Sequence, residues 1–228
     1  MSDPARILVL GVSGLVGQQV LSAAMGHRDV RLVGLARREV LLPQGARMEL
    51  HLAPVEGWGQ EIAAIAPDAV ICALGTTIAK QGGDKAAFAA IDRDLVLASA
   101  AQAKAAGARG FAVVSSVGAD MGAKAFYLRV KGEMEAGLAK LDFARLDIFR
   151  PGLLRGKRVD DARPLEALGA ALAPLADLAM HGERRKYRSI RGADVAMAAL
   201  QCAREKAPGR FVHHHDEILR LSARWQRG

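Results

Sequence analysis

The segment RILVLGVSGLVGQQV, residues 6–20, constrains the fold more than any other part of the chain. Residues 6–10 are mostly apolar and predict a short buried strand, and glycines follow at positions 11, 14 and 17, where a helix is predicted to begin. Gly11 permits a tight turn, Gly14 lets a phosphate approach the backbone, and Gly17 lets the helix pack closely on the sheet. The free N–H groups at the start of the helix suit a pyrophosphate. A strand, a spaced glycine turn and a helix in this order predict dinucleotide binding.

Apolar runs and alanine-rich helical segments alternate through most of the remaining chain, which is typical of βαβ units and a parallel sheet. We expect further strands at residues 30–36, 48–52, 68–74, 110–116, 145–152, 187–190 and 210–215. We expect helices at 15–26, 85–107, 125–140 and 192–205, one or two helices at 165–180, and a last helix from Asp216. The expected fold class is therefore α/β, a Rossmann-like doubly wound parallel sheet. We expect one NAD(P)-binding domain over residues 1–228, with a core at 1–152 and a small C-terminal substrate lobe at 153–228 packed on it.

Composition and charge exclude several classes of function. The net charge is +8, but the basic residues are dispersed and aromatic residues make up only 4%, too few for base stacking. We therefore expect no nucleic acid as a partner and assign the charge to attraction of a phosphorylated small molecule. No stretch reaches the ~18 apolar residues of a membrane span, and no apolar run of the signal-peptide type opens the chain. Cys72 and Cys202 lie in apolar segments and are predicted to be reduced and buried, so we expect a cytoplasmic protein.

The end of the second predicted strand bears on the choice of nucleotide. Arg37 and Arg38 stand about twenty residues after the glycine turn, where an NAD-binding protein would place an acid for the ribose. Guanidinium groups suit a 2′-phosphate, so we expect NADP(H) as the cofactor. Glu39 would bind the ribose under a shifted alignment, and NAD(H) stays the alternative.

The expected cofactor contacts lie at the carboxyl ends of the first and fourth strands, where ligands bind in open α/β sheets. They are Gly11, Ser13, Gly14, Leu15, Val16 and Gly17 of the glycine turn, and Ala73, Leu74 and Gly75 of the segment CALGTT. The alternative for the second group is an ordinary buried strand end.

The segment YLRVKGEME at residues 127–135 places a tyrosine four residues before a lysine on a predicted helix. Positions i and i+4 share a helix face, so Tyr127 and Lys131 can contact the same small molecule. A nearby cation favours the phenolate, so the pair can act as a proton donor and acceptor. An exposed neighbour pair with no role in chemistry is the alternative that the spacing alone leaves open.

These features together resemble the short-chain dehydrogenase/reductase superfamily and, among its atypical members, the Tat-interacting protein 2-like branch of NADPH-binding oxidoreductases. The resemblance runs through nearly the whole chain, in the motifs GVSGLVG, CALGTT, IDRDLVL, SSVGAD, FYLRVKGEME and FRPGLL. It implies a Rossmann fold, an NADP(H) cofactor, and hydride transfer to or from a small carbonyl or hydroxyl substrate.

The resemblance also implies roles for individual residues. Tyr127 would exchange a proton with the substrate oxygen, and Lys131 would hold the nicotinamide ribose. A serine after the fifth strand would orient the carbonyl group; Ser116 fits that position best, and Ser115 takes its place if the strand register shifts by one. The remaining contacts implied with the cofactor are Pro151, Leu154 and Arg163.

One residue departs from the superfamily pattern. Many members carry an asparagine in the fourth helix that supports a proton relay, where this chain has Asp92. Two other functions therefore stay open: an NADPH-binding regulatory sensor with little turnover, and a nucleotide-sugar epimerase or dehydratase, which typically has a longer substrate lobe. A protein partner or a homodimer is compatible with these functions. His213 and His215 would share one strand face, but no third ligand stands near them, so we expect no metal site.

Overall fold

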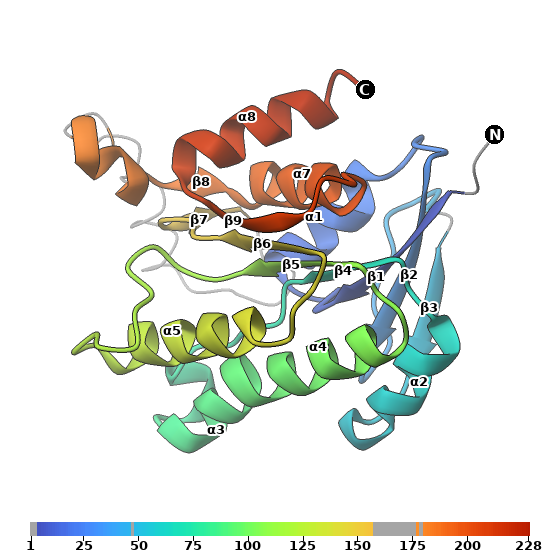
Figure 1. Cartoon of the computed structure of the whole chain (residues 1–228), viewed down its shortest axis with the longest axis horizontal. Helices are drawn as coiled ribbons and strands as arrows, with labels where there is room; N and C mark the ends of the chain where they lie inside the picture. The colour runs from blue at the N-terminus through green and yellow to red at the C-terminus, as the bar shows by residue number, and fades with distance from the viewer. Residues whose placement is uncertain (1–3, 47, 157–176, 178–179) are drawn as a thin grey trace.

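The computed structural model describes residues 4–46, 48–156, 177 and 180–228 as a sheet of parallel strands covered by helices on both faces (Figure 1). The sheet has seven strands in the order β3-β2-β1-β4-β5-β6-β9. Their bounds are Ala5–Leu10 (β1), Val30–Ala36 (β2), Glu49–Leu52 (β3), Ala69–Cys72 (β4), Gly110–Val114 (β5), Arg145–Phe149 (β6) and Gly209–His213 (β9). Two short strands, β7 (Leu154–Arg155) and β8 (Ile190–Arg191), pair with each other outside it. The predicted Rossmann-like α/β fold is confirmed.

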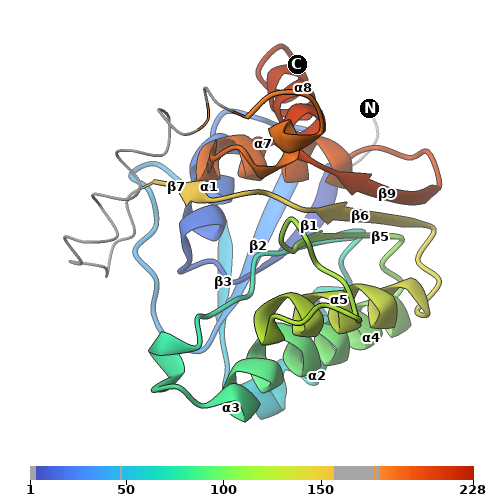
Figure 2. The ribbon, with the colours of Figure 1, turned by 90° about the vertical axis from the view of Figure 1, so that its left-hand side faces the viewer.

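The helices divide between the two faces of the sheet, as Figures 1 and 2 show from two directions. One face carries α1 (Leu15–Ala23), α7 (Gly192–Ala203) and α8 (His215–Trp225). The other face carries α2 (Trp58–Ile65), α3 (Lys85–Ala89), α4 (Val96–Ala105) and α5 (Phe126–Ala139). Because both faces are covered, the central strands β4 and β5 hold no polar residue and show no alternation of polar and apolar residues.

Strand β1 shows how the sequence fills both layers. Ile7 and Val9 belong to the hydrophobic core on the side of α1 and α7, whereas Leu8 and Leu10 belong to the core on the side of α2 and α4. Successive side chains of a strand point to opposite faces, so one run of apolar residues contributes to two cores. All four side chains are fully buried, and each contributes about 2 kcal/mol of hydrophobic stabilisation.

Three local elements differ from the sequence-based expectation. The helix expected at 85–107 is divided by a π-helical turn, Ala90–Leu95, between α3 and α4. Helix α2 was not expected, because Gly57 and Gly59 weaken the helical signal of that segment. The strand expected at 187–190 is wrong for most of its length, since a 3₁₀ turn ends at Tyr187 and β8 begins only at Ile190.

The C-terminal part of the chain extends the central sheet. Strand β9 pairs in parallel with β6, and α7 packs on the same face as α1. Arg163 and nearly all of the helical segment expected at 165–180 lie outside the described residues. Within the described ranges, no helix has both the length and the apolar character that a membrane crossing requires.

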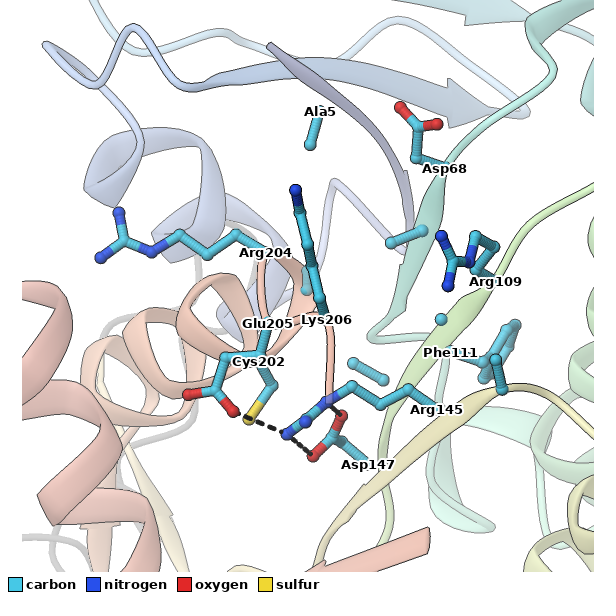
Figure 3. A pocket seen from close by; sticks show the side chains of 15 residues that line it. Ala5, Asp68, Arg109, Phe111, Arg145, Asp147, Cys202, Arg204, Glu205 and Lys206 are labelled. Carbon is cyan, nitrogen blue, oxygen red and sulfur yellow. Dashed lines mark hydrogen bonds and ion pairs between the residues drawn. The ribbon is translucent and has the colours of Figure 1, made fainter. Parts of the chain in front are cut away.

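A network of buried charges joins β6 to its neighbours at the amino-terminal edge of the sheet (Figure 3). Arg145 donates to both oxygens of Asp147, at 2.6 and 3.0 Å, and lies 3.0 Å from Glu205. Nε2 of His213, on β9, lies 2.8 Å from Oδ1 of Asp147, an oxygen that also accepts from Arg145. Burial alone would raise the pKa of Asp147, but the hydrogen bonds from His213 and Arg145 outweigh it and hold that pKa below its usual value.

Replacing Asp147 with asparagine should lower the free energy of unfolding by about 3 kcal/mol at pH 7, because Arg145 is then left buried without its main counter-charge. The folded-state pKa of Asp147 is depressed, so its contribution is fully present above about pH 4 and is lost as the pH falls further. Urea denaturation at several pH values measures both effects. Asp94→Asn is the matched control, since its ion pair with Arg93 is 55% exposed on the Asp94 side and should contribute little. Equal losses in the two variants would contradict the argument.

Candidate functional site

The glycine turn lies where β1 and β4 end side by side, the point at which the strand order reverses. The Ala73 N–H group donates to the Leu10 carbonyl at 2.9 Å, so the two strand ends are joined directly. Gly11 has a φ of +81°, and a β-carbon there would lie 2.5 Å from the Ala73 carbonyl oxygen. A β-carbon at position 17 would overlap the carbonyl oxygen of Gly11. Positions 11 and 17 of the turn therefore accept only glycine, and the turn fits a dinucleotide phosphate group.

A cleft opens beside this turn as two adjoining cavities of about 180 and 340 Å³. Eight residues line both cavities: Ser13, Gly14, Arg37, Arg38, Ala73, Leu74, Gly75 and Thr76. The smaller cavity also reaches Trp58 and Leu95, and the larger one extends to α5 and β7. This is the carboxyl edge of the sheet, where open α/β folds bind ligands.

Most of the residues expected to contact a cofactor line this cleft. They are Gly11, Ser13, Gly14, Leu15, Val16, Arg37, Arg38, Ala73, Leu74, Gly75, Tyr127, Lys131 and Leu154. Gly17 lies behind the turn and acts through its contact with Gly11. Pro151 is buried outside the cavity lining, and its carbonyl accepts from Val117 at 3.0 Å. Sequence reasoning missed Thr76, Thr77, Lys80 and Gln81, which follow the CALG segment directly.

Helix α5 brings Tyr127 and Lys131 to the wall of the larger cavity. Tyr127 is half-buried, and its ring packs against Phe88 at 5.6 Å between centroids. The Lys131 side chain is only 5% exposed, and its ammonium nitrogen lies 2.8 Å from Oδ1 of Asp92. The spacing of four residues along the helix therefore places both side chains beside the same space.

Asp92 is the buried counter-ion of this lysine. Its side chain is 1% exposed and lies in the π-helical turn, and its second oxygen accepts from the Thr76 N–H group at 2.8 Å. One carboxylate thus connects Lys131 to the loop that lines both cavities. An asparagine at this position would offer the loop an acceptor but would leave the ammonium group without a negative partner.

Of the two serines after β5, Ser115 lines the larger cavity and the preferred Ser116 does not. Phe111 and Val113 of β5 point into the core beneath α4 and α5, and strand alternation puts residue 115 on the same side. The Ser115 N–H group still donates to Phe149 at 2.7 Å, so the strand pairing continues to this residue. Ser115 lines the larger cavity, whereas the Ser116 hydroxyl lies outside it and donates to Val117 at 3.3 Å.

Two further residues hold Ser115 in place, and the sequence reasoning missed both. The Ser115 hydroxyl lies 2.5 Å from Oε1 of Glu135, which is buried on α5. Arg150, the residue after β6, donates to both oxygens of Glu135 at 3.0, 3.2 and 2.5 Å. These hydrogen bonds raise the pKa of Arg150. For Glu135 the sequence did hold a signal. Tyr127, Lys131 and Glu135 follow one another at intervals of four residues, so they share one face of the predicted helix.

One group among the described residues has the composition of a metal site: Asp147, Cys202 and His213, whose ligand atoms lie within 4.8 Å of one another. Arg145 already binds both oxygens of Asp147, and burial raises the pKa of the Cys202 thiol. A cation and a protonated thiol both disfavour a metal ion here. His213 is buried at the end of the edge strand β9, whereas His215 begins α8 and pairs separately with Asp216, so the two histidines do not share a strand face.

Known proteins of similar sequence cover most of the chain. Protein HTATIP2 from Rattus norvegicus is 38% identical over 170 residues, which are 71% of this chain and 67% of that protein. The mitochondrial protein fmp52 from Emericella nidulans is 33% identical over 176 residues, 74% of this chain and 75% of that protein. No family model matches the chain.

Solved structures with the same fold are more distant in sequence. A UDP-glucose 4-epimerase from Thermotoga maritima has a TM-score of 0.68 at 16% identity and covers 97% of this chain and 82% of its own. The enzyme WbmG from Bordetella bronchiseptica, solved in complex with NAD, has a TM-score of 0.65 at 16% identity over 99% of this chain and 79% of its own. At these identities the likeness establishes the fold.

The names of the fungal relatives correct the expected location. Three of them, from Emericella nidulans, Aspergillus niger and Scheffersomyces stipitis, are named as mitochondrial proteins. The prediction of a cytoplasmic protein is therefore wrong. It rested on general composition and cysteine usage, which carry no targeting information. The glycine cradle, the fold and these relatives agree: the chain belongs to the NAD(P)-binding short-chain dehydrogenase/reductase superfamily, in the atypical branch of HTATIP2 and FMP52.

Proposed function

We propose that the protein is an NADP(H)-dependent oxidoreductase acting on a small carbonyl or hydroxyl compound. The observation that carries this proposal is the presence of Tyr127, Lys131 and Ser115 on the wall of the cavity that begins at the glycine turn. One cavity is thus lined by a proton donor, a cation and a hydroxyl group, and it adjoins the glycine turn that fits a phosphate group. The NAD complex of the similarly folded WbmG supports a nicotinamide dinucleotide as the cofactor.

The chemistry divides between the cofactor and the chain. A bound nicotinamide supplies or accepts hydride. The Tyr127 hydroxyl donates a proton to the substrate oxygen during reduction and takes it back during oxidation. Lys131 keeps two N–H donors beyond its ion pair with Asp92, and these suit the hydroxyl groups of a ribose. Leu15, Val16 and Leu154 supply an apolar wall of the same cavity.

The preference for NADP(H) rests on the two arginines at the end of β2. Arg37 and Arg38 are exposed and line both cavities of the cleft. A guanidinium group forms charge-assisted, bidentate hydrogen bonds with phosphate, and a 2′-phosphate is the feature that separates the two nucleotides.

Replacing Arg37 and Arg38 together with alanine should weaken NADPH binding by roughly 10- to 100-fold and leave NADH binding within about threefold. Fluorescence titration of each reduced cofactor measures the two affinities. Arg28→Ala with Arg31→Ala is the control, since it removes the same charge from residues that do not line the cleft. Equal affinities for NADPH and NADH in the unmodified protein would remove the argument for NADP(H).

Tyr127→Phe should reduce turnover by at least about 100-fold while cofactor binding and the free energy of unfolding change little. The variant keeps the ring packed against Phe88 and deletes only the proton. NADPH oxidation with a panel of small carbonyl compounds measures turnover. Tyr187→Phe is the control, because Tyr187 is the only other tyrosine and is 46% exposed. Undiminished turnover in Tyr127→Phe would exclude the proposed proton donor.

The Asp92–Lys131 ion pair favours one second candidate, a regulatory protein that binds NADPH and turns over little. The carboxylate neutralises the charge that a proton-transfer site would otherwise use, and it holds the loop at Thr76. A sensor needs the glycine turn and the arginines but tolerates the loss of Tyr127. NADPH binding with no oxidation of the cofactor by any carbonyl compound, in the parent and in Tyr127→Phe alike, would favour the sensor over the enzyme.

A further inference from the structure

A separate cavity, of about 220 Å³, opens at the amino-terminal edge of the sheet, opposite the edge that carries the glycine turn (Figure 3). Its walls are the starts of β1, β4, β5 and β6 and the segment 202–206 at the end of α7. None of its lining residues lines the two cavities of the cleft. A ligand bound here would therefore neither need nor displace a nucleotide in the cleft.

Small residues on the α7 side of the sheet leave this space. Ile7, Ala69, Gly110 and Arg145 are register neighbours across four adjacent strands. Such neighbours present their side chains to the same face of the sheet. Ala69 and Gly110 therefore leave a hollow between the larger side chains of Ile7 and Arg145.

The charges around the cavity are unequal. Four cationic residues and three carboxylates line it: Arg109, Arg145, Arg204 and Lys206 against Asp68, Asp147 and Glu205. Arg145 pairs with both Asp147 and Glu205. Arg204 lies 2.8 Å from Asp29 and stands at the carboxyl end of α7, whose partial negative charge it offsets.

Arg109 and Lys206 are the cations of this set that are left over. Among the residues that the structure describes, neither side chain has a hydrogen bond or an ion pair. Arg109 directly precedes β5 and Lys206 follows α7, so the two approach the cavity from different walls (Figure 3). Asp68, the remaining carboxylate, already accepts from the Arg6 N–H group at 2.8 Å. The rim of the cavity thus holds an excess of positive charge.

The buried guanidinium group of Arg145 adds a further donor. Its hydrogen bonds to Asp147 and to the Ala207 carbonyl use three of its five N–H groups, and Glu205 lies 3.0 Å from one terminal nitrogen. Within the described ranges, at least one N–H group is therefore left for a ligand. The Arg145 side chain is only 8% exposed, and a charged donor that is buried without an acceptor costs free energy.

We propose that this cavity is a binding site for a small organic anion, a carboxylate with a compact apolar body. Arg109, Lys206 and Arg145 bind the carboxylate by charge-assisted hydrogen bonds. The buried side chains of Ala69, Ala112 and Cys202 line the part that takes the apolar body. Protein cavities of about 150 Å³ hold benzene, so a cavity of about 220 Å³ takes a molecule of the size of benzoate. The inference does not depend on the proposed function.

Isothermal titration calorimetry of the full chain with benzoate, benzamide and inorganic phosphate tests the class of ligand. We expect a Kd of about 1 mM or lower for benzoate. Benzamide, which keeps the ring without the charge, and phosphate, which lacks the apolar body, should each bind at least about tenfold more weakly. No saturable binding of benzoate up to about 10 mM would overturn the proposal. Equal affinity for benzamide or for phosphate would do so as well.

Two kinds of variant test the location. Arg109→Ala combined with Lys206→Ala removes the charge of the rim and should weaken benzoate binding at least about tenfold. Gly110→Val keeps the charges, fills the hollow and should abolish binding. A β-carbon at position 110 would lie 3.5 Å from that of Ala69, an ordinary contact, and valine suits a strand, so this variant should fold. Thermal melting checks its folding, and the alanine pair decides the outcome by itself if it does not fold.

Arg210→Ala combined with Arg227→Ala is the matched control, since it removes the same charge from exposed residues outside this cavity and should leave benzoate binding unchanged. Undiminished affinity in the Arg109 and Lys206 variant, or displacement of benzoate by saturating NADPH, would assign the ligand to another place and refute the inference. NADPH titration of the same samples keeps the two proposals apart. Benzoate binding without NADPH binding would remove the proposed function and leave this site standing.

Discussion

The contact between Gly17 and the carbonyl group of Gly11 determines how closely α1 can approach the sheet. A side chain at position 17 would overlap that carbonyl group, so the helix start reaches the end of β1 only because no β-carbon is present. The same turn needs the positive φ of Gly11 and its contact with Ala73 of the neighbouring strand end. The phosphate cradle, the position of α1 and the meeting of β1 with β4 thus share one steric condition.

Helix α5 combines the chemical groups of the cleft in a single rigid element. Tyr127, Lys131 and Glu135 follow at intervals of four residues, and each meets a different partner: a cavity, a carboxylate on the π-helical turn, and a serine after β5. Two of these partners are buried polar contacts that fix side-chain positions before any ligand arrives. Such pre-arrangement lowers the reorganisation that ligand binding would otherwise require.

The sequence was sufficient where function depends on local spacing. The glycine turn lies within seven residues and the Tyr127–Lys131 pair within one helical turn, so both were predictable without tertiary information. The choice between Ser115 and Ser116 was not predictable in this way, because β5 is apolar at every position and so carries no sign of which side faces α5. The partnership of Glu135 with Arg150 depends on the pairing of β5 with β6 and on how α5 lies beneath them. That arrangement is tertiary and leaves no local pattern.

The π-helical turn at Ala90–Leu95 has a geometric consequence for the helices on either side of it. A π turn holds one residue more than an α turn, and each α-helical residue advances the side chains by about 100°. The insertion therefore sets the rotational phase between α3, which buries Phe88 beside Tyr127, and α4, which buries Val96 in the core under the sheet. Asp92 lies buried within this turn. Asp92, which pairs with Lys131, thus lies in the turn that sets the rotation of α4 relative to α3.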